Sequence, residues 1–158
     1  MTTLFAIDPG MTGAIACIRD GVASVEDLPV ITDRALAWVD GNALTAKLLR
    51  LRSGKPATCI IERVGAMPGQ GVSSSFKFGM GFGSILGVLQ SMQIPIEFVT
   101  PVVWKRDLGL AKEKTASLDK ARLLFPYVDL HLQKHDGRAE ALLIAHWYMT
   151  KAQAKAAA

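Results

Sequence analysis

The stretch that decides the fold is the N-terminal run over residues 3–28, which reads TLFAIDPGMTGAIACIRDGVASVEDL. Its first apolar segment stops at Pro9-Gly10, a dipeptide that cannot continue a regular strand ladder. Its second apolar segment is followed by Asp20-Gly21, which is typical of two-residue hairpin turns. A third apolar segment completes the run. The stretch therefore predicts an antiparallel, three-stranded meander.

The rest of the chain alternates between helix and strand patterns. The predicted elements are a helix over residues 42–52, a strand over 58–62, a helix over 73–93, a strand over 95–99, and helices starting at Thr100-Pro101, over 114–125 and over 136–151. Residues 29–34 are predicted to be a loop. A meander followed by strands joined through helices predicts an α/β fold, with helices flanking a mixed five-stranded sheet. No repeat or boundary interrupts it, so residues 1–158 are predicted to form one domain.

The composition is that of an ordinary globular protein, because half of the 158 residues are hydrophobic and a fifth are charged. No apolar run approaches the ~20 residues that span a bilayer. The N-terminus lacks the basic region and cleavage site of a secretory signal. Cys17 and Cys59 lie inside apolar runs, so we expect buried free thiols in a reducing cytosol rather than a disulfide. These features predict a cytoplasmic protein with no membrane span.

Basic residues are concentrated in one part of the chain. The net charge of +4 is only a mild indication of a polyanionic partner. The distribution says more, because six basic residues fall within one short stretch: Lys105, Arg106, Lys112, Lys114, Lys120 and Arg122. A solvated helical face would have the same composition. Charge alone therefore leaves a nucleic-acid surface and a solvated face as equal alternatives.

Four acidic residues occupy positions that favour cation binding. Asp8 and Glu62 each end an apolar strand, where a carboxylate is costly to desolvate unless it is paired or binds a cation. Asp136 and Glu140 are four residues apart at the start of the last helix and share one helical face. The alternatives are strand ends that reach water or a backbone amide, and an N-cap role for Asp136. The helix after Glu140 is almost wholly apolar, so it must pack on the sheet while its first turn presents two acids.

Phosphodiester hydrolysis would explain such a gathering of acids. The reaction needs a nucleophilic water and a neutralised leaving oxygen, and two divalent ions about 4 Å apart can supply both. Mg²⁺ prefers carboxylate and water oxygens. The four acids therefore predict a metal-dependent hydrolase that acts on phosphodiesters.

Three motifs, taken in order, resemble the RuvC family of Holliday-junction resolvases: IDPGMTG at residues 7–13, IIERV at 60–64 and HDGRAEALLIA at 135–145. The match spans nearly the whole chain. The resemblance implies an RNase H-like fold, a homodimer, and paired symmetrical nicks in four-way DNA junctions. It also implies two Mg²⁺ ions per active site, with Mn²⁺ able to substitute. A branch-migration helicase is the further partner that it suggests, and a bacterial, phage or organellar source would fit.

The resemblance assigns catalytic, metal-binding roles to the four acids. Asp8 matches the first-strand aspartate, Glu62 the central-strand glutamate and Glu140 the acid of the final helix. Asp136 fits the fourth acid, although its four-residue spacing from Glu140 is that of mitochondrial and phage-type members rather than of many bacterial ones. His135 either assists near the metals or is a surface residue, as a lone histidine before a helix more often is.

The resemblance also gives the basic stretch a role. Lys105, Arg106, Lys112 and Lys114 fall where family members contact DNA phosphates, which would give affinity without reading sequence. Arg63 and Lys77 are further candidates for DNA contacts.

The long helix over residues 73–93 contains four glycines: Gly79, Gly81, Gly83 and Gly87. Each costs about 1 kcal/mol against alanine inside a helix. Close approach of another backbone, within the fold or across a dimer, would explain them, and a frayed segment is the alternative. The helix resembles the element through which RuvC-family proteins dimerise.

Three other functions compete with junction cleavage. A related RNase H-like nuclease could act on RNA or on other branched or flap nucleic acid. A catalytically silent DNA-binding dimer could keep the fold. A sugar-kinase-like ATPase would use a similar first strand and turn, but it needs two such halves, and this chain holds one.

Overall fold

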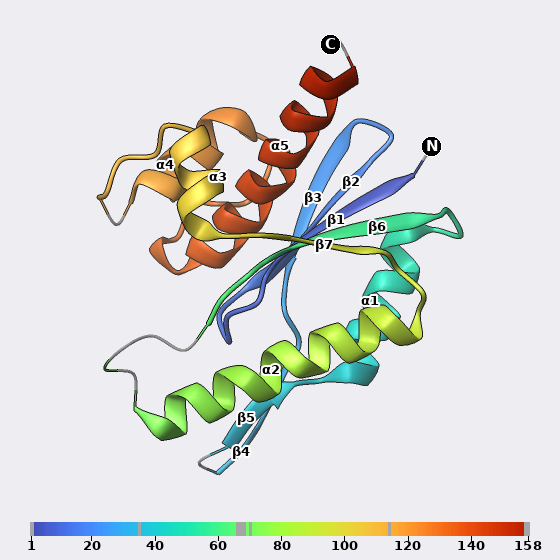
Figure 1. Ribbon diagram of the computed structural model, residues 1–158, viewed down its shortest axis with the longest axis vertical. Helices are drawn as coiled ribbons and strands as arrows, with labels where there is room; N and C mark the ends of the chain where they lie inside the picture. The colour runs from blue at the N-terminus through green and yellow to red at the C-terminus, as the bar shows by residue number, and fades with distance from the viewer. Residues whose placement is uncertain (1, 35, 66–68, 70, 114, 157–158) are drawn as a thin grey trace.

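A mixed five-stranded sheet forms the centre of the molecule (Figure 1). The computed structural model describes residues 2–34, 36–65, 69, 71–113 and 115–156. Within the sheet the strands lie in the order β3-β2-β1-β6-β7. Their bounds are Thr3–Asp8 for β1, Ala14–Arg19 for β2, Val22–Asp27 for β3, Ala57–Glu62 for β6 and Ile96–Val99 for β7. The first three strands pair antiparallel, whereas β6 pairs parallel with both β1 and β7. The predicted meander and mixed sheet are confirmed.

Helices cover both faces of the sheet (Figure 1). They are α1 (Gly41–Arg52), α2 (Val72–Ser91), α3 (Pro101–Asp107), α4 (Ala116–Leu124) and α5 (Asp136–Ala156), with a short 3₁₀ turn, η1, over Gln133–His135. Helices α1 and α2 lie on one face, and α4 and α5 lie on the other. The predicted helices are confirmed, with bounds that differ by a few residues. The predicted hairpin turn is present too, because Asp20 and Gly21 both have positive φ, 52° and 80°.

The prediction of a loop over residues 29–34 was wrong. Strand β4 (Val30–Asp33) pairs antiparallel with β5 (Leu36–Val39) and forms a separate two-stranded sheet. Strand β5 packs on α2, where the Val39 side chain lies against the helix backbone at Gly81. Burial of Val39, together with the β-branched residues of β4, gives the segment a reason to pair that the turn-forming residues around it concealed.

Alternation along the strands divides the apolar residues into two cores. Phe5 and Ile7 of β1 face α1 and α2, whereas Leu4 and Ala6 face α5. The α1/α2 core also holds both cysteines, which are buried and free, as the sequence predicted.

Small residues line the contact between α5 and the first two strands, within a core that also holds large side chains such as Trp104. Alanines of β1 and β2 face alanines of α5, and all are fully buried: Ala6, Ala14, Ala16, Ala139, Ala141 and Ala145. The first turn of α5 comes closer still. A Cβ added to Gly137 would lie 2.3 Å from the carbonyl oxygen of Thr12 and 2.9 Å from Cα of Gly13. Helix α5 is therefore pressed against the loop that follows β1.

One helix among the described residues, α2, is long and apolar enough to cross a membrane by length and composition. The sequence prediction that no segment approaches this length was therefore too strict. A single such helix is weak evidence for a membrane span, and α2 packs against α1 and β5, with Ile85 and Leu89 fully buried.

Candidate metal centre

Two of the four predicted acids are brought together by strand register. Strands β1 and β6 run parallel with Ile7 opposite Ile61, so the next residue of each strand, Asp8 and Glu62, ends at the same edge of the sheet. Alternation turns both side chains toward α5, on the same face as Ala6 and Ile60. The sheet therefore places two carboxylates side by side beneath the last helix.

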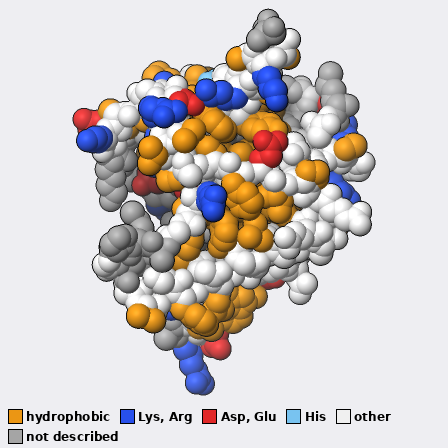
Figure 2. All heavy atoms as spheres, viewed as in Figure 1, with side chains coloured by type: hydrophobic (Ala, Val, Ile, Leu, Met, Phe, Trp, Pro, Cys, Tyr) orange, Lys and Arg blue, Asp and Glu red, His pale blue; other side chains and the backbone are white. Residues whose placement is uncertain are grey.

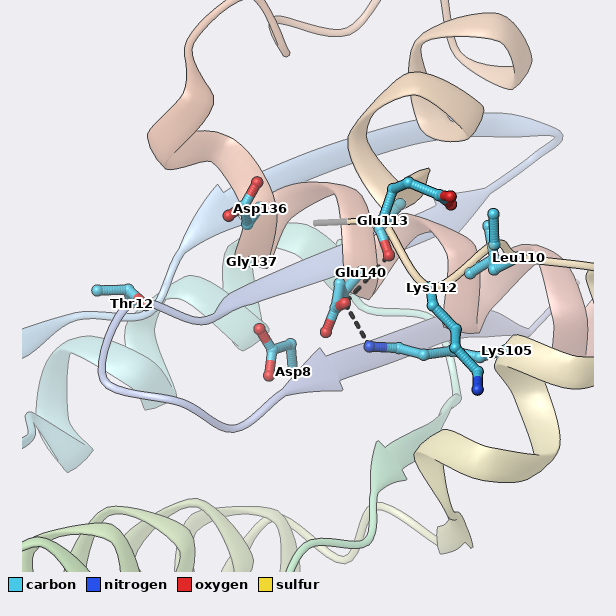
Figure 3. Close-up of a pocket in the computed structure, with 11 residues that line it drawn as sticks. Asp8, Thr12, Lys105, Leu110, Lys112, Glu113, Asp136, Gly137 and Glu140 are labelled. Carbon is cyan, nitrogen blue, oxygen red and sulfur yellow. Dashed lines mark hydrogen bonds and ion pairs between the residues drawn. The ribbon is translucent and has the colours of Figure 1, made fainter. Parts of the chain in front are cut away.

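Helix α5 supplies the third acid. Glu140 lies one turn into the helix, and Figure 3 shows its carboxylate directed toward Asp8. Ligand oxygens of Asp8, Glu62 and Glu140 all lie within 4.8 Å of one another. The close approach of α5 to the sheet, which Gly137 permits, makes this convergence possible. Three carboxylates from three separate elements can hold a metal ion.

The fourth predicted acid, Asp136, lies at the rim of the same site. It lines a cavity of about 580 Å³ together with Asp8 and Glu140, but it is not one of the three converging carboxylates. Figure 3 shows it at the start of α5, with its carboxylate directed away from Asp8. Its backbone angles are helical (φ −52°, ψ −47°), whereas an N-cap residue has non-helical angles. The N-cap explanation for Asp136 is therefore not supported.

Electrostatics at the centre favour a bound cation. Burial, and then the nearby charges of Glu140 and Glu62, raise the pKa of Asp8 to about 7. Burial also raises the pKa of Glu62, and the hydrogen bond from Trp104 opposes that rise. A divalent cation strongly stabilises the ionised form of such carboxylates, because it replaces their lost hydration and cancels their mutual repulsion. The residues present fit a metal centre.

Three neighbouring side chains hold the acids in place. The fully buried Trp104 donates a hydrogen bond from Nε1 to Glu62 Oε1 at 2.8 Å. Lys105 forms an ion pair with Glu140 Oε1 at 2.7 Å, and the Ser117 hydroxyl donates to the same oxygen at 3.1 Å. Sequence reasoning missed Trp104 and Ser117. A buried tryptophan needs an acceptor for its Nε1–H, but only the tertiary structure identifies Glu62 as that acceptor.

The predicted DNA-contacting residues are distributed unevenly around the cavity. Lys105 and Lys112 line it, and the Lys105 side chain is 39% exposed. Arg106 is exposed and paired with the neighbouring Asp107. The other candidates lie elsewhere: Arg63 is exposed just after β6, Lys77 is partly buried on α2, and Lys114 lies outside the described residues.

Two residues of the basic stretch have structural contacts instead. Lys120 donates to the carbonyl oxygen of Leu108 at 2.8 Å, and Arg122 donates to that of Leu130 at 2.9 Å. These contacts tie together the segments around α4. The stretch is therefore neither a uniform nucleic-acid surface nor a uniformly solvated face.

The strand order β3-β2-β1-β6-β7, with helices on both faces, is that of an RNase H-like fold. Its first strand ends in an aspartate, and further acids come from the neighbouring strand and the last helix. Solved structures agree. Thermus thermophilus RuvC in complex with a Holliday junction substrate superposes with a TM-score of 0.65 at 18% identity, covering 97% of this chain and 96% of that one. Another T. thermophilus RuvC structure gives a TM-score of 0.59 at 18% identity, covering 98% and 97%. The chain has the RuvC fold.

The sequence comparison points in the same direction. No model of a known protein family matches the chain. The chloroplastic Holliday junction resolvase MOC1 of Chlamydomonas reinhardtii is 44% identical over 85 residues, which make up 51% of this chain and 10% of MOC1. The chain thus spans about a tenth of the length of this relative. The predicted resemblance to the RuvC resolvases is confirmed. Because MOC1 is chloroplastic, the cytoplasmic location stays a prediction.

Proposed function

We propose that this chain is a metal-dependent endonuclease that resolves four-way DNA junctions by paired symmetrical nicks. The observation that carries the proposal is the convergence of Asp8, Glu62 and Glu140 within 4.8 Å on a RuvC fold. The similarity to a protein named as a Holliday junction resolvase supports the choice of substrate. In this proposal residues 1–158 act as one nuclease domain in DNA recombination and repair.

The converging acids would hold two divalent ions, Mg²⁺ or Mn²⁺, with Asp136 available at the rim. Such a pair, when bound, activates a water and neutralises the leaving oxygen of the phosphodiester. The chain's own residues prepare the site for it. Trp104 and Ser117 orient the carboxylates of Glu62 and Glu140, and the hard oxygen ligands favour Mg²⁺ over softer metals.

Basic residues at the cavity would position the DNA backbone. Lys105 reaches into the cavity beside Glu140, and Lys112 lies at its wall. Charges placed next to the acids would bring a phosphate to the metal centre and offset the repulsion between DNA and the carboxylates. Arg106, Arg63 and Lys77 would add contacts further out, where the duplex arms leave the site.

A homodimer would provide the two active sites that a symmetric junction requires. Helix α2 offers a suitable surface, because a Cβ added at Gly79, Gly83 or Gly87 would meet nothing within 4 Å. These three glycines follow one another along the exposed side of the helix. Figure 2 shows hydrophobic side chains gathered over β7 and beside α2 on the same side of the molecule. A branch-migration helicase remains a further predicted partner.

Cleavage of a synthetic four-way junction tests the proposal. With Mg²⁺ the wild-type chain should give two symmetrically placed nicks, and Asp8→Asn should abolish cleavage while leaving junction binding intact. Linear duplex, flap and RNA–DNA hybrid are the alternative substrates whose cleavage is compared with that of the junction. Preferential cutting of a flap or hybrid would support the alternative nuclease, and binding without cleavage by the wild type would support a catalytically silent DNA-binding protein.

Salt dependence tests the role of the basic residues. Lys112→Ala should weaken junction binding most at low salt and reduce the slope of log affinity against log salt by about one charge contact. Lys55→Ala is the matched control, because Lys55 pairs with Asp20 at the opposite end of the sheet. An equal change in both variants would exclude a specific phosphate contact at Lys112.

A further inference from the structure

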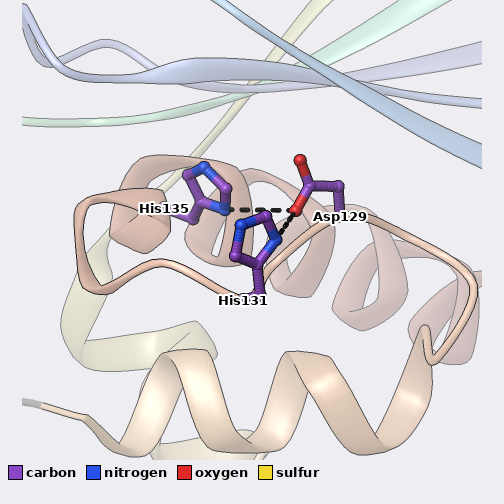
Figure 4. A group of neighbouring side chains, drawn as sticks. All are labelled: Asp129, His131 and His135. Carbon is purple, nitrogen blue, oxygen red and sulfur yellow. Dashed lines mark ion pairs between the residues drawn. The ribbon is translucent and has the colours of Figure 1, made fainter.

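A second cluster of metal-ligating side chains lies on the loop that leads into α5. Asp129, His131 and His135 bring their ligand atoms within 4.8 Å of one another. Figure 4 shows both imidazoles directed toward the Asp129 carboxylate. Nδ1 of His131 pairs with Oδ1 of Asp129, and Nδ1 of His135 lies 3.8 Å from the same oxygen. The two imidazole rings meet edge to face, with centroids 5.5 Å apart. None of the three residues lines the nuclease cavity.

His135 is the residue that indicates a ligand. It is 4% exposed, which corrects the expectation of a surface histidine. Its Nδ1 is buried and has no hydrogen-bond partner among the described residues, although it is directed toward Asp129 and His131. A buried polar atom left without a partner destabilises the folded state, so such atoms are rare and need an explanation. A cation bound between the three side chains would supply the missing partner.

We propose that Asp129, His131 and His135 form a transition-metal site of the Zn²⁺ class, separate from the carboxylate centre. Two imidazole nitrogens and one carboxylate oxygen suit zinc rather than Mg²⁺. Zinc–nitrogen bonds of about 2.0–2.1 Å place tetrahedral ligands about 3.3 Å apart, so the 3.8 Å between His135 and Asp129 needs only a small rotation to close. Asp129 and His131 are exposed, which leaves the fourth position open to water.

The neighbouring arginine does not compete for the ligand oxygen. Arg138 Nη1 lies 3.6 Å from Oδ2 of Asp129. Both histidines approach the other oxygen, Oδ1. Its guanidinium is already held by both carboxylate oxygens of Asp27, at 2.6 and 2.8 Å. A bidentate pair of this kind neutralises the arginine. Oδ1 of Asp129 is therefore left to the two histidines, and a metal would enter by opening the direct contact between this oxygen and His131 Nδ1, with both atoms becoming ligands.

The position of the site gives it a structural consequence. Its ligands span residues 129–135, a segment that ends one residue before Asp136 at the rim of the nuclease cavity. A metal here would tie residues 129–131 of the loop after α4 to η1, the turn that leads directly into α5. The inference goes beyond the proposed nuclease activity and can be tested without measuring cleavage.

Zn²⁺ titration of the Asp8→Asn/Glu140→Gln double variant tests the site, because these changes weaken the carboxylate centre. Calorimetry should show one bound Zn²⁺ per chain, together with a rise in the unfolding midpoint that grows with Zn²⁺ concentration. Adding His131→Ala should lower the affinity at least about tenfold, since loss of even an outer-shell partner costs about 10–100-fold. His131 is exposed, so its replacement should leave the fold intact, as circular dichroism would verify.

His146→Gln is the matched control, because His146 packs edge-on against Phe125 and is not part of the cluster. Asp129→Asn should repeat the effect of His131→Ala, whereas the control should bind Zn²⁺ like its parent. Absence of stoichiometric Zn²⁺ binding would overturn the inference. Equal affinity in the His131→Ala and His146→Gln variants would do so as well. Neither result depends on whether the chain cleaves junctions.

Discussion

The two faces of the central sheet are packed in different ways. On the α5 face, small residues let the helix come so close that Gly137 has no room for a Cβ. On the α1/α2 face, large side chains of strand and helix, such as Phe5, Ile7 and Leu48, fill the space between them. The polar site lies on the closely packed face. A helix held against backbone has little freedom to shift, so the difference suggests that close packing is what keeps Glu140 within reach of Asp8.

Two helical glycines differ in the space that surrounds them. A Cβ on Gly137 would meet the backbone of Thr12 and Gly13, whereas a Cβ on Gly83 of α2 would meet nothing within 4 Å. An identical substitution should therefore have opposite effects at the closely packed position and at the open one.

Replacement of Gly137 by alanine should have the largest effect. The added methyl group would clash with backbone that cannot rotate away, and overpacking of this kind costs about 3 kcal/mol of unfolding free energy. Urea denaturation measures the loss. Junction cleavage should fall further than stability alone explains, because displacement of α5 moves Glu140 away from Asp8. Wild-type stability in this variant would show that α5 is not rigidly held.

Trp104→Phe should lower the unfolding free energy by about 1–3 kcal/mol, because Glu62 loses its buried donor. Without that hydrogen bond the pKa of Glu62 should rise further, and Mg²⁺ affinity should change with it. Trp38→Phe on the β4–β5 hairpin is the matched control, since Trp38 is only partly buried and away from the acids. Similar losses in both variants would mean that ring size, rather than the hydrogen bond to Glu62, accounts for the effect.

At neutral pH in chelator, Asp8→Asn should raise the unfolding free energy by about 1–2 kcal/mol. This is part of the roughly 4 kcal/mol that a rise of about three pKa units represents, because the buried amide is itself left with unsatisfied hydrogen-bonding groups. The folded state holds the Asp8 proton up to about pH 7, whereas the unfolded chain releases it near pH 4. The Asp8 contribution to stability is therefore full below about pH 4 and is lost as the pH rises to about 7.

Denaturation of the wild type in chelator between pH 4 and 7 should show this decline, and Asp8→Asn should remove it. Asp33→Asn, at an exposed position of β4, is the control and should keep the wild-type slope. A slope that survives in Asp8→Asn would assign the proton to another group.

Gly83→Ala should have the smallest effect and the opposite sign. Alanine is favoured over glycine inside a helix by up to about 1 kcal/mol, and the position is open. Chemical denaturation at low protein concentration should show the gain. If copies of the chain pack through this side of α2, sedimentation should show weaker self-association as well. A loss of monomer stability would mean that position 83 is not open in the folded chain.

Local patterns in the sequence account for the helices, the five strands of the main sheet and the positions of the four acids. Local signals were enough for the meander, since Pro9-Gly10 ends β1 and Asp20-Gly21 needs only its own backbone preferences to turn. The positions of Asp8 and Glu62 at strand ends were visible in the same way, because a polar residue that closes an apolar run is a local pattern. The five-stranded sheet followed from the order of these elements.

Three contacts could be found only from the tertiary structure. The β4–β5 hairpin forms against α2, Trp104 donates to an acid 42 residues earlier in the chain, and His135 is buried beside Asp129. The first two contacts join distant parts of the chain, and Asp129 and His135 are joined by an irregular loop, so no local pattern could reveal these contacts. The different roles of Glu140 and Asp136 also depend on the tertiary structure. Both acids share one face of α5, but only Glu140 lies close to Asp8 and Glu62.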